Sequence, residues 1–422
     1  MHHLDQGRGQ STEGSQSLSS LLPANSTSGD APSLRNLTAR LIYESEHSHS
    51  GGLWTDVVIY RDLLEGLGYV VEIFNMREYP TPESAAAGVA NIQVLVERLR
   101  HPWLVVGRYN MFVINQDIIH DIRLYRLLDA IVCKSVMAQE LVDQYLRNYS
   151  REHTPLGLDV FYVGHTSADP REKLASLPAI QQDFTQFIHV GGKSLNKGSD
   201  VVYDTWRKHP EWPRLHLTDF MHNNRYFRAE HECADCAYNS WPNRTGVMIQ
   251  ENLILYTKRL ADEELLRLQQ SSGVHLCPSR EEGFGHYINE ARALGALVMT
   301  TNWAPMNDMV QDHFGVLIPC QLTSASLYQS PLPGNQACVV GPTDLEKAME
   351  KYFGLIGKNE NDDQLRLDKV RSMGEFARVR FEDDRDDFRD RMQNLFGKVL
   401  PQMMLTHQNV HNDDNDVSEK QE

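Results

Sequence analysis

The sequence has no long apolar run. No stretch approaches about 18 consecutive apolar residues, the length that a transmembrane helix needs, so no such helix is predicted. The N-terminal stretch MHHLDQGRGQSTEGSQ also has no apolar core of the kind that a secretory signal carries. Both absences favour a cytoplasmic protein.

Cysteine is scarce. Its six positions in 422 residues are 133, 233, 236, 277, 320 and 338. Such sparse use does not indicate a disulfide framework and favours a reducing compartment. Cys233 and Cys236 form one C-x2-C pair, but zinc needs four ligands, and His222 and His231 would have to complete the set. The sequence leaves a zinc site and plain thiols both open there.

Basic residues are outnumbered. The chain has 41 Lys and Arg against 57 Asp and Glu, which gives a formal net charge of −16. Binding to nucleic acid phosphates requires a basic surface, so nucleic acid is excluded as a main partner. A local basic pocket for a small phosphate ligand remains compatible with this charge.

The length and the pattern of the chain predict two folded domains between two polar tails. A chain of 422 residues exceeds what one hydrophobic core normally serves. Residues 1–35, rich in Ser, Gly, Gln and Asn, are predicted to be disordered, and so is the acidic tail 406–422. We expect one domain at 36–170 and a second at 186–380, with a boundary near 165–185.

Both predicted domains alternate short apolar runs with amphipathic helices, which indicates parallel sheets covered on both faces. Candidate strands of the first domain lie at 37–45, 69–74, 91–99, 111–118 and 129–135. Candidate strands of the second lie at 186–192, 214–219, 274–279, 296–301 and 315–320. The helix at 261–271 has Asp262 as its expected N-cap. A final helix at 381–400 is expected to pack back onto the first domain.

Ligands of open α/β sheets bind beyond the carboxyl ends of the strands. The loop GGKSLNKG follows such a strand and carries Lys193 and Lys197 ahead of a helix. Free N–H groups at a helix start favour phosphate, and two ammonium groups there would hold a diphosphate. An exposed loop with solvated lysines is the competing interpretation.

The stretch CPSREEGFGHYINEARALG lies at another strand end. Gly283 and Gly285 would let backbone amides approach a ligand closely, and Glu282 and Glu290 would accept hydroxyl donors from a sugar. The alternative is a pair of carboxylates stabilised by the helix dipole. The glycines and the eight-residue offset favour the ligand.

These motifs together resemble a known family. PSREEGFGHYINEA is similar to the E-x7-E signature of retaining glycosyltransferases of family 4, the glycosyl transferases group 1 set with the GT-B fold. HVGGKSLNKG resembles the diphosphate loop of that family, although the family usually has arginine at the position of Lys193. The pair Gly51 and Gly52 resembles its N-terminal glycine loop. The resemblance is strong over 186–320 and weaker over 37–165.

The resemblance implies a fold and a reaction. The fold would be α/β of the GT-B type, with two doubly wound Rossmann-like domains facing a central cleft. The reaction would move a sugar from a nucleotide sugar, UDP- or GDP-linked, to an acceptor, with retention of anomeric configuration. No metal or other cofactor would be required.

The resemblance also implies residue roles. Glu282, Lys193 and Lys197 would be the catalytic residues, with the two lysines neutralising the leaving diphosphate. Residues implied in donor binding are Gly51, Gly52, Leu255, Tyr256, Gly283, Phe284, Gly285 and Glu290. Among these, Glu290 would bind the ribose, and Leu255 and Tyr256 would receive the base.

The acceptor side is less defined. Asn115, Gln116, Asp117 and His120 lie near a candidate strand end of the first domain and would bind hydroxyls or assist proton movement, or they are ordinary polar loop residues. The acceptor class, whether glycan, lipid or protein, is open. Two alternatives to a transferase stay open as well: a sugar-nucleotide-binding protein without transfer activity, and a nucleotide-sugar epimerase of the same fold.

Overall fold

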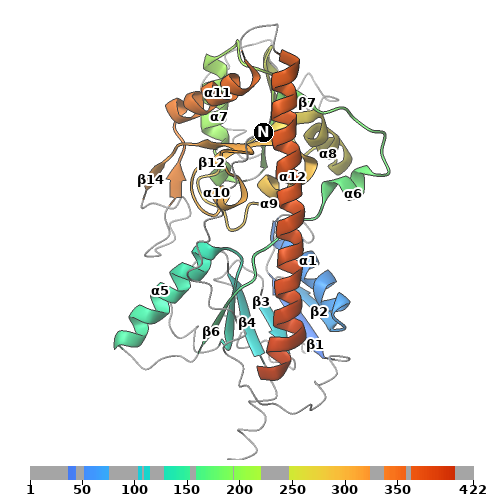
Figure 1. The fold of residues 1–422 in the computed structure, drawn as a ribbon, viewed down its shortest axis with the longest axis vertical. Coiled ribbons are helices and arrows are strands. Elements are labelled where there is room, and N and C mark those ends of the chain that lie inside the picture. The colour runs from blue at the N-terminus through green and yellow to red at the C-terminus, as the bar shows by residue number, and fades with distance from the viewer. Residues whose placement is uncertain are drawn as a thin grey trace, which may run out of the picture.

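The computed structural model describes residues 37–43, 52–75, 103–106, 109–114, 128–152, 158–192, 194–219, 247–323, 337–357 and 363–403. It contains two large sheets, each flanked by helices, which stand end to end with one long helix beside both (Figure 1). We call the six-stranded sheet with its helices the first lobe and the seven-stranded sheet with its helices the second lobe. The predicted α/β fold class is confirmed. The tails 1–35 and 406–422, predicted to be disordered, lie outside the described residues.

The first lobe is built on a mixed sheet with the strand order β2-β1-β3-β4-β5-β6. Its strands are β1 Thr38–Tyr43, β2 Val70–Asn75, β3 Trp103–Val106, β4 Tyr109–Ile114, β5 Ala130–Cys133 and β6 Asp159–Tyr162. The expectation of an all-parallel sheet is wrong for β3, which is antiparallel to both β1 and β4. Only two residues separate β3 from β4, and a connection that short joins antiparallel strands only. The candidate strand at 91–99 lies outside the described residues.

Helix α1 (Gly52–Gly66) covers this sheet through one apolar face. Val57, Tyr60 and Leu64 recur at helical spacing, and all three are fully buried against strand residues such as Leu41. Helix α5 (Val136–Glu152) follows β5. These contacts fix the start of α1 at the carboxyl end of β1.

The second lobe is built on a sheet with the order β13-β12-β11-β7-β8-β10-β9, in which only the edge strand β9 is antiparallel to its neighbour. Its strands are β7 Asp183–Gly192, β8 Leu215–Asp219, β9 Val247–Gln250, β10 Leu253–Tyr256, β11 Ser272–Cys277, β12 Leu297–Thr301 and β13 Gly315–Ile318. Its helices are α7 Ser199–Lys208, α8 Asp262–Ser271, α9 His286–Leu294, α10 Met306–Met309 and α11 Pro342–Ile356. The N-cap of α8 is Ala261, so the expectation of Asp262 as the cap is wrong by one residue, although its carboxylate still lies in the first turn.

A two-stranded ribbon of β14 (Gln321–Thr323) and β15 (Ala337–Val339) follows β13. Cys320, directly before β14, and Cys338 of β15 form a disulfide, a pair that the sparse cysteine usage did not predict. The antiparallel register brings them together, and their separation in the sequence gives no sign of it. Cys133 and Cys277 are free and buried.

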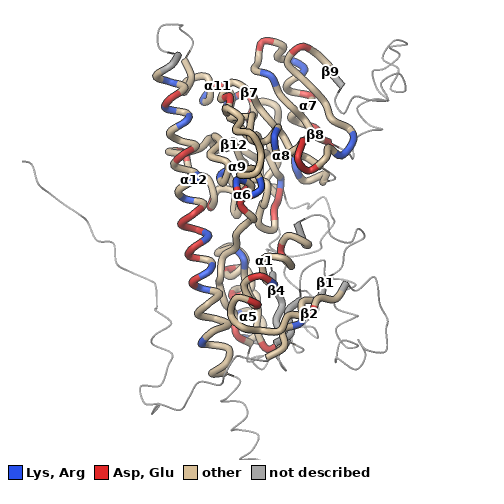
Figure 2. The backbone as a smooth tube through the Cα atoms, turned by 90° about the vertical axis from the view of Figure 1, so that its right-hand side faces the viewer, with Lys and Arg blue, Asp and Glu red and all other residues tan. Residues whose placement is uncertain are grey.

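The chain crosses between the lobes twice. The first crossing, residues 163–182, contains the short helix α6 (Pro170–Leu174). The second is α12 (Asp363–Asn394), which runs along the second lobe and down beside the first, and continues into η5 (Leu395–Val399) (Figures 1 and 2). The expected return helix at 381–400 corresponds to the end of α12 and to η5. Its buried side chains share a core with β1, α1 and β5: Phe388, Met392, Leu395, Phe396 and Leu400.

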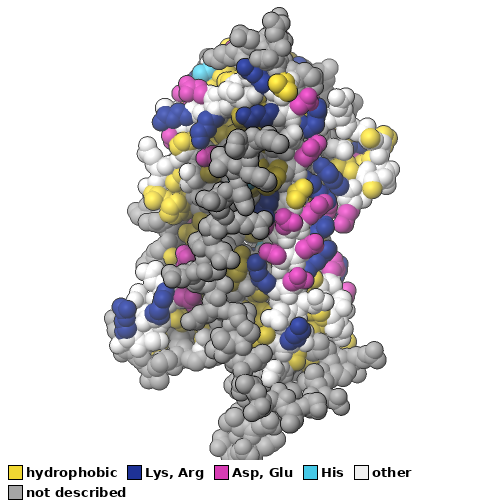
Figure 3. Space-filling view, viewed as in Figure 1, with side chains coloured by type: hydrophobic (Ala, Val, Ile, Leu, Met, Phe, Trp, Pro, Cys, Tyr) yellow, Lys and Arg dark blue, Asp and Glu magenta, His cyan; other side chains and the backbone are white. Residues whose placement is uncertain are grey.

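The exposed side of α12 carries interleaved charges. Basic and acidic side chains alternate on the face of the molecule over this helix (Figure 3). Several pairs are three or four residues apart, such as Arg371 with Asp368 at 2.7 Å and Arg378 with Glu382 at 2.7 Å. Within the described residues, no helix has the length and apolar character needed to span a membrane.

Candidate active site

The site lies where two strand ends of the second lobe meet. β7 and β11 are parallel neighbours at the middle of the sheet, so the loops after their carboxyl ends lie side by side. The loop after β7 leads through η3 (Leu195–Lys197) into α7, and the loop after β11 leads through residues 278–285 into α9. The first loop carries Lys197, and the second carries Glu282, with Glu290 in the helix that follows it.

The two loops touch through a glycine. Gly198 has φ of +73°, a conformation that L residues rarely adopt, and it lies between η3 and α7. A Cβ atom on Gly198 would lie 2.5 Å from the carbonyl oxygen of Pro278. Glycine therefore permits both the left-handed turn and the close approach of the backbone after β11.

Lys197 and Glu282 are in direct contact. The Lys197 Nζ atom donates to Glu282 Oε1 at 2.5 Å, and the Ser279 hydroxyl donates to the same oxygen at 2.5 Å. The Lys197 ammonium also lies 3.6 Å from the centre of the Tyr287 ring, within the range of a cation–π contact. A carboxylate and an ammonium that are 85 residues apart are thus held at one place.

Further polar contacts tie the same two loops together. Asn196 donates to Glu281 at 2.7 Å, and Arg280 donates to Asp200 at 2.5 Å and to the carbonyl of Leu195 at 3.0 Å. The backbone N–H of Arg280 donates to the carbonyl of Asn196. The site is therefore built on two mutually braced loops.

The turn before α9 carries the remaining residues of the motif. Gly285, with φ of +101°, is the N-cap of α9, so the amides at the helix start have no side-chain cap. Glu290, in the middle of α9, makes no hydrogen bond or ion pair with the described residues. Burial raises the pKa of Glu290, and the charge of Lys197 opposes that rise. A half-buried carboxylate with no donor among the described residues is suited to accept ligand hydroxyls.

Tyr256 ends β10, and its hydroxyl lies 2.9 Å from Nδ1 of His216 on the neighbouring β8. Burial raises the pKa of Tyr256. Leu255 is buried in the core of the lobe. Of these two residues, Tyr256 lies at the strand end and Leu255 faces the interior.

A second polar cluster, which the sequence analysis did not find, bridges the two lobes. Asp56 of α1 is its centre, and its carboxylate contacts the ammonium of Lys134, which follows β5. His165 Nε2 lies 2.6 Å from Asp56 Oδ1, and His286 Nε2 of α9 lies 3.0 Å from the same oxygen. Ser167 contacts the other ring nitrogen of His286 at 2.9 Å.

Burial sets the protonation of this cluster. Burial alone would raise the pKa of Asp56, but the charge of Lys134 and the hydrogen bonds from the histidines lower it well below its usual range. Burial, helped by the charge of Lys134, lowers the pKa of His165 to about 3. At neutral pH the cluster therefore holds an ionised Asp56 and a neutral His165. Burial lowers the pKa of Lys134, and the charge of Asp56 opposes that fall.

The ligand atoms of this cluster are spaced as in a metal site, but the cluster has no negative charge left to neutralise a metal ion. Asp56, His165 and His286 each place one potential ligand atom within 4.8 Å of the others. The Lys134 ammonium already neutralises Asp56, and both are almost completely buried. A divalent ion would add two uncompensated positive charges beside Lys134, so the residues present do not fit a resident metal.

A partial signal for this cluster was present in the sequence. Lys134 and His165 each follow a strand, where ligand-binding side chains are expected. Asp56 precedes Val57 within the apolar pattern of α1, which marks it as a polar residue on a packed helix. Nothing in the sequence indicates that His286, from the other lobe, joins them.

Residues 247–328, which include Glu282 and Glu290, match the family model described as Glycosyl transferases group 1. This segment of the second lobe is similar to that family. No curated protein matches the sequence.

Solved structures give the fold. A glycosyltransferase from Rickettsia africae is 13% identical, with 87% of this chain and 98% of that chain covered and a TM-score of 0.52. The fold is the GT-B fold that the sequence predicted. Anabaena HepE in complex with UDP and glucose is 14% identical over 85% of this chain and 99% of that chain, with a TM-score of 0.48. An α,α-trehalose-phosphate synthase (UDP-forming) from Burkholderia vietnamiensis is 9% identical over 70% of each chain, with a TM-score of 0.43.

Several predicted site residues lie outside the described residues: Gly51, Lys193, Asn115, Gln116, Asp117 and His120. The same holds for the zinc candidates His222, His231, Cys233 and Cys236. Gly52 is the first residue of α1. The structure therefore brings Lys197 and Glu282 into contact, while the acceptor side stays a prediction from the sequence.

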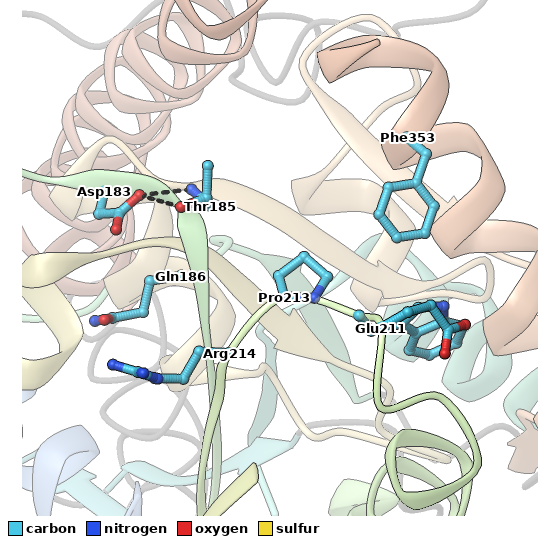
Figure 4. Close-up of a pocket in the computed structure, with 8 residues that line it drawn as sticks. Asp183, Thr185, Gln186, Glu211, Pro213, Arg214 and Phe353 are labelled. Atoms are coloured by element: carbon cyan, nitrogen blue, oxygen red, sulfur yellow. Dashed lines mark hydrogen bonds between the residues drawn. The ribbon is translucent and has the colours of Figure 1, made fainter. Parts of the chain in front are cut away.

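A surface hollow of the second lobe lies elsewhere. Figure 4 shows it at the amino ends of β7 and β8, where Asp183 begins β7 and Arg214 precedes β8. Asp183 accepts hydrogen bonds from the amide and the hydroxyl of Thr185 there. Because these are amino ends of parallel strands, the hollow is on the opposite edge of the sheet from Lys197 and Glu282.

Proposed function

We propose that the protein transfers a sugar from a nucleotide sugar to an acceptor hydroxyl. The observation that carries the proposal is the contact of Lys197 with Glu282 at the carboxyl edge of the second sheet. The contact supports the proposal because the ammonium would bind a diphosphate and the carboxylate would accept sugar hydroxyls, and because Glu282 lies in the segment that matches the group 1 model. The second lobe is the donor-binding domain in this proposal, and the first lobe binds the acceptor.

The chemistry follows from the charges. When the bond between the sugar and the diphosphate breaks, negative charge develops on the phosphate oxygens. Lys197 and the uncapped amides at the start of α9 would stabilise that charge, so a metal ion is not required. Glu282 would hold donor sugar hydroxyls, and the amides of Gly283, Phe284 and Gly285 would face the sugar and the phosphates.

Finer features of the proposal rest on the E-x7-E spacing of Glu282 and Glu290. We assign the reaction to the retaining type of family 4, with Glu290 binding the ribose and the base lying near Tyr256. Lys193 would supply a second charge for the diphosphate. The donor is UDP- or GDP-linked, and the acceptor hydroxyl belongs to a glycan, a lipid or a protein bound by Asn115, Gln116, Asp117 or His120.

The test begins with calorimetric titration of UDP, GDP and ADP, with EDTA and then with magnesium. We expect one nucleotide to bind equally well in both buffers. Lys197→Ala should weaken that binding and reduce the rate of transfer by about 10²- to 10³-fold, because one charge at the leaving group is lost. Lys208→Ala, at an exposed position of α7, is the matched control and should behave as the wild type.

Product analysis completes the test. Incubation of nucleotide sugars of the preferred nucleotide with an acceptor should yield a new glycoside. Its anomeric configuration, read by NMR, should equal that of the donor. An inverted product would overturn retention alone. An isomerised donor sugar would show that the protein is an epimerase and not a transferase. If no nucleotide bound, the whole proposal would be overturned.

A further inference from the structure

His286 connects the donor turn to the first lobe. It is the first residue of α9, directly after the turn Gly283–Gly285. Both of its ring nitrogens are bonded outside the second sheet. Nε2 lies 3.0 Å from Asp56 Oδ1 of α1, and Nδ1 lies 2.9 Å from the Ser167 hydroxyl of the crossing segment.

The hydrogen bonds around His286 have one consistent direction. Asn289 donates to Ser167 at 3.4 Å, Ser167 donates to His286 Nδ1, and His286 Nε2–H donates to Asp56. This assignment follows from the ionised Asp56, which can only accept. Loss of the imidazole would leave the Ser167 hydroxyl without an acceptor and remove one donor from a buried carboxylate.

Phe284 of the same turn makes a second contact, with His165, which is bonded to Asp56. The Phe284 ring packs edge-on against the His165 ring with 4.8 Å between their centres. His165 is itself fixed by its bond to Asp56 and by packing against Phe388. The donor turn and the residue after it thus contact Asp56 of α1 and His165 of the crossing segment, both of which are buried.

We propose that His286 is a positioning residue that holds the donor turn against the first lobe and so keeps the two lobes together for transfer. The inference rests on the proposed function, because the turn it places is the one assigned to the donor sugar. The side chains to which nucleotide binding is assigned, such as Lys197, Glu290 and Tyr256, all belong to the second lobe and are not held by His286. His286 should therefore affect transfer far more than nucleotide affinity.

The experiment compares His286→Leu, His286→Gln and the wild type. Leucine removes both ring nitrogens, whereas the glutamine amide can still donate to Asp56. We expect His286→Leu to lower kcat by about tenfold or more, since small misplacements of reacting groups are costly, with the dissociation constant of UDP changed less than about threefold. His286→Gln should recover part of kcat. His313→Leu, an exposed histidine of the same lobe, is the control.

Small-angle scattering with UDP supplies a readout that does not depend on turnover. His286→Leu should show a larger radius of gyration than the wild type, and His286→Gln an intermediate one. Equal kcat and equal radius in His286→Leu and wild type would overturn the inference. If the wild type transfers no sugar, the proposed function fails, while the scattering comparison still decides whether His286 holds the lobes together.

Discussion

At the scale of single residues, Gly198 is required for two reasons, its backbone conformation and the close approach of Pro278. Its φ of +73° needs a residue without Cβ, and the carbonyl of Pro278 occupies the space where that Cβ would lie. Gly198→Ala should therefore lower the free energy of unfolding by about 1–3 kcal/mol and weaken nucleotide binding, because the loop after β7 must move away from the loop after β11. Chemical denaturation and calorimetry with UDP measure both effects.

The matched control for this change is Gly354→Ala. Gly354 lies inside α11 with no atom within 4 Å of the added Cβ. Alanine there should raise the free energy of unfolding by about 0.5–1 kcal/mol through helix propensity. Equal effects of the two substitutions would contradict the role given to Gly198.

The residues of the donor side were predictable for a physical reason. Lys197 and Glu282 both follow buried strands, and the carboxyl ends of parallel neighbours share one edge, so their approach follows from the strand pattern. Asp56 and His286 belong to different lobes. Their contact depends on how the lobes are oriented, and no local pattern of either segment records that orientation.

At the scale of elements, the five strands predicted for the second lobe correspond to β7, β8, β11, β12 and β13, because their apolar runs are buried on both faces of the sheet, whereas the edge strand β9 was not predicted. β3 was missed because its four residues give too short a run to show a period. The disulfide was missed because it depends on the register of β14 with β15. A final helix was predicted at 381–400, but not that one continuous helix from Asp363 to Asn394 would pack on both lobes.

Helix α12 supplies part of the core of the first lobe, and Phe388 is the test of that contribution. Its side chain is fully buried and meets Tyr60 and His165 edge-on. Phe388→Ala should lower the free energy of unfolding by about 3–5 kcal/mol through the cavity it leaves. Scanning calorimetry should show the loss in the transition of the first lobe.

Phe376, on the same helix, provides the comparison. It is 43% exposed and packs only at the surface against His313 and Phe314. Phe376→Ala should change the free energy of unfolding by less than about 1 kcal/mol. If Phe388→Ala had an equally small effect, α12 would not be part of the first core.

At the scale of the whole molecule, buried neutral histidines connect stability to pH. Burial lowers the pKa of His165 to about 3 and the pKa values of His189, His216 and His275 to about 4. An unfolded histidine titrates near 6.5. Between pH 6.5 and about 4 the unfolded chain therefore binds more protons than the folded one, and stability must fall as the pH falls.

The carboxylates act in a separate window. The pKa of Asp56 is lowered by Lys134 and the histidines against the effect of burial, and that of Asp169 by Arg378 against the effect of burial. A lowered carboxylate pKa gives stability that is present above the unfolded value near 3.9 and is lost as the pH falls below it. A loss of stability above pH 4 is thus attributable to the histidines.

We expect the free energy of unfolding, measured by urea denaturation between pH 7 and pH 5, to fall by up to about 1.4 kcal/mol per pH unit for each of the buried histidines. His275→Gln isolates one of them, because the amide can replace the Nε2–H bond to the carbonyl of Gln269, which is 2.9 Å long. The slope of its free energy of unfolding against pH should correspond to about one proton fewer than in the wild type. Exposed His313→Gln should keep the slope of the wild type. If the slope for His275→Gln equalled that of the wild type, His275 would be accessible to protons in the folded state. That result would contradict its buried position in the centre of the second sheet.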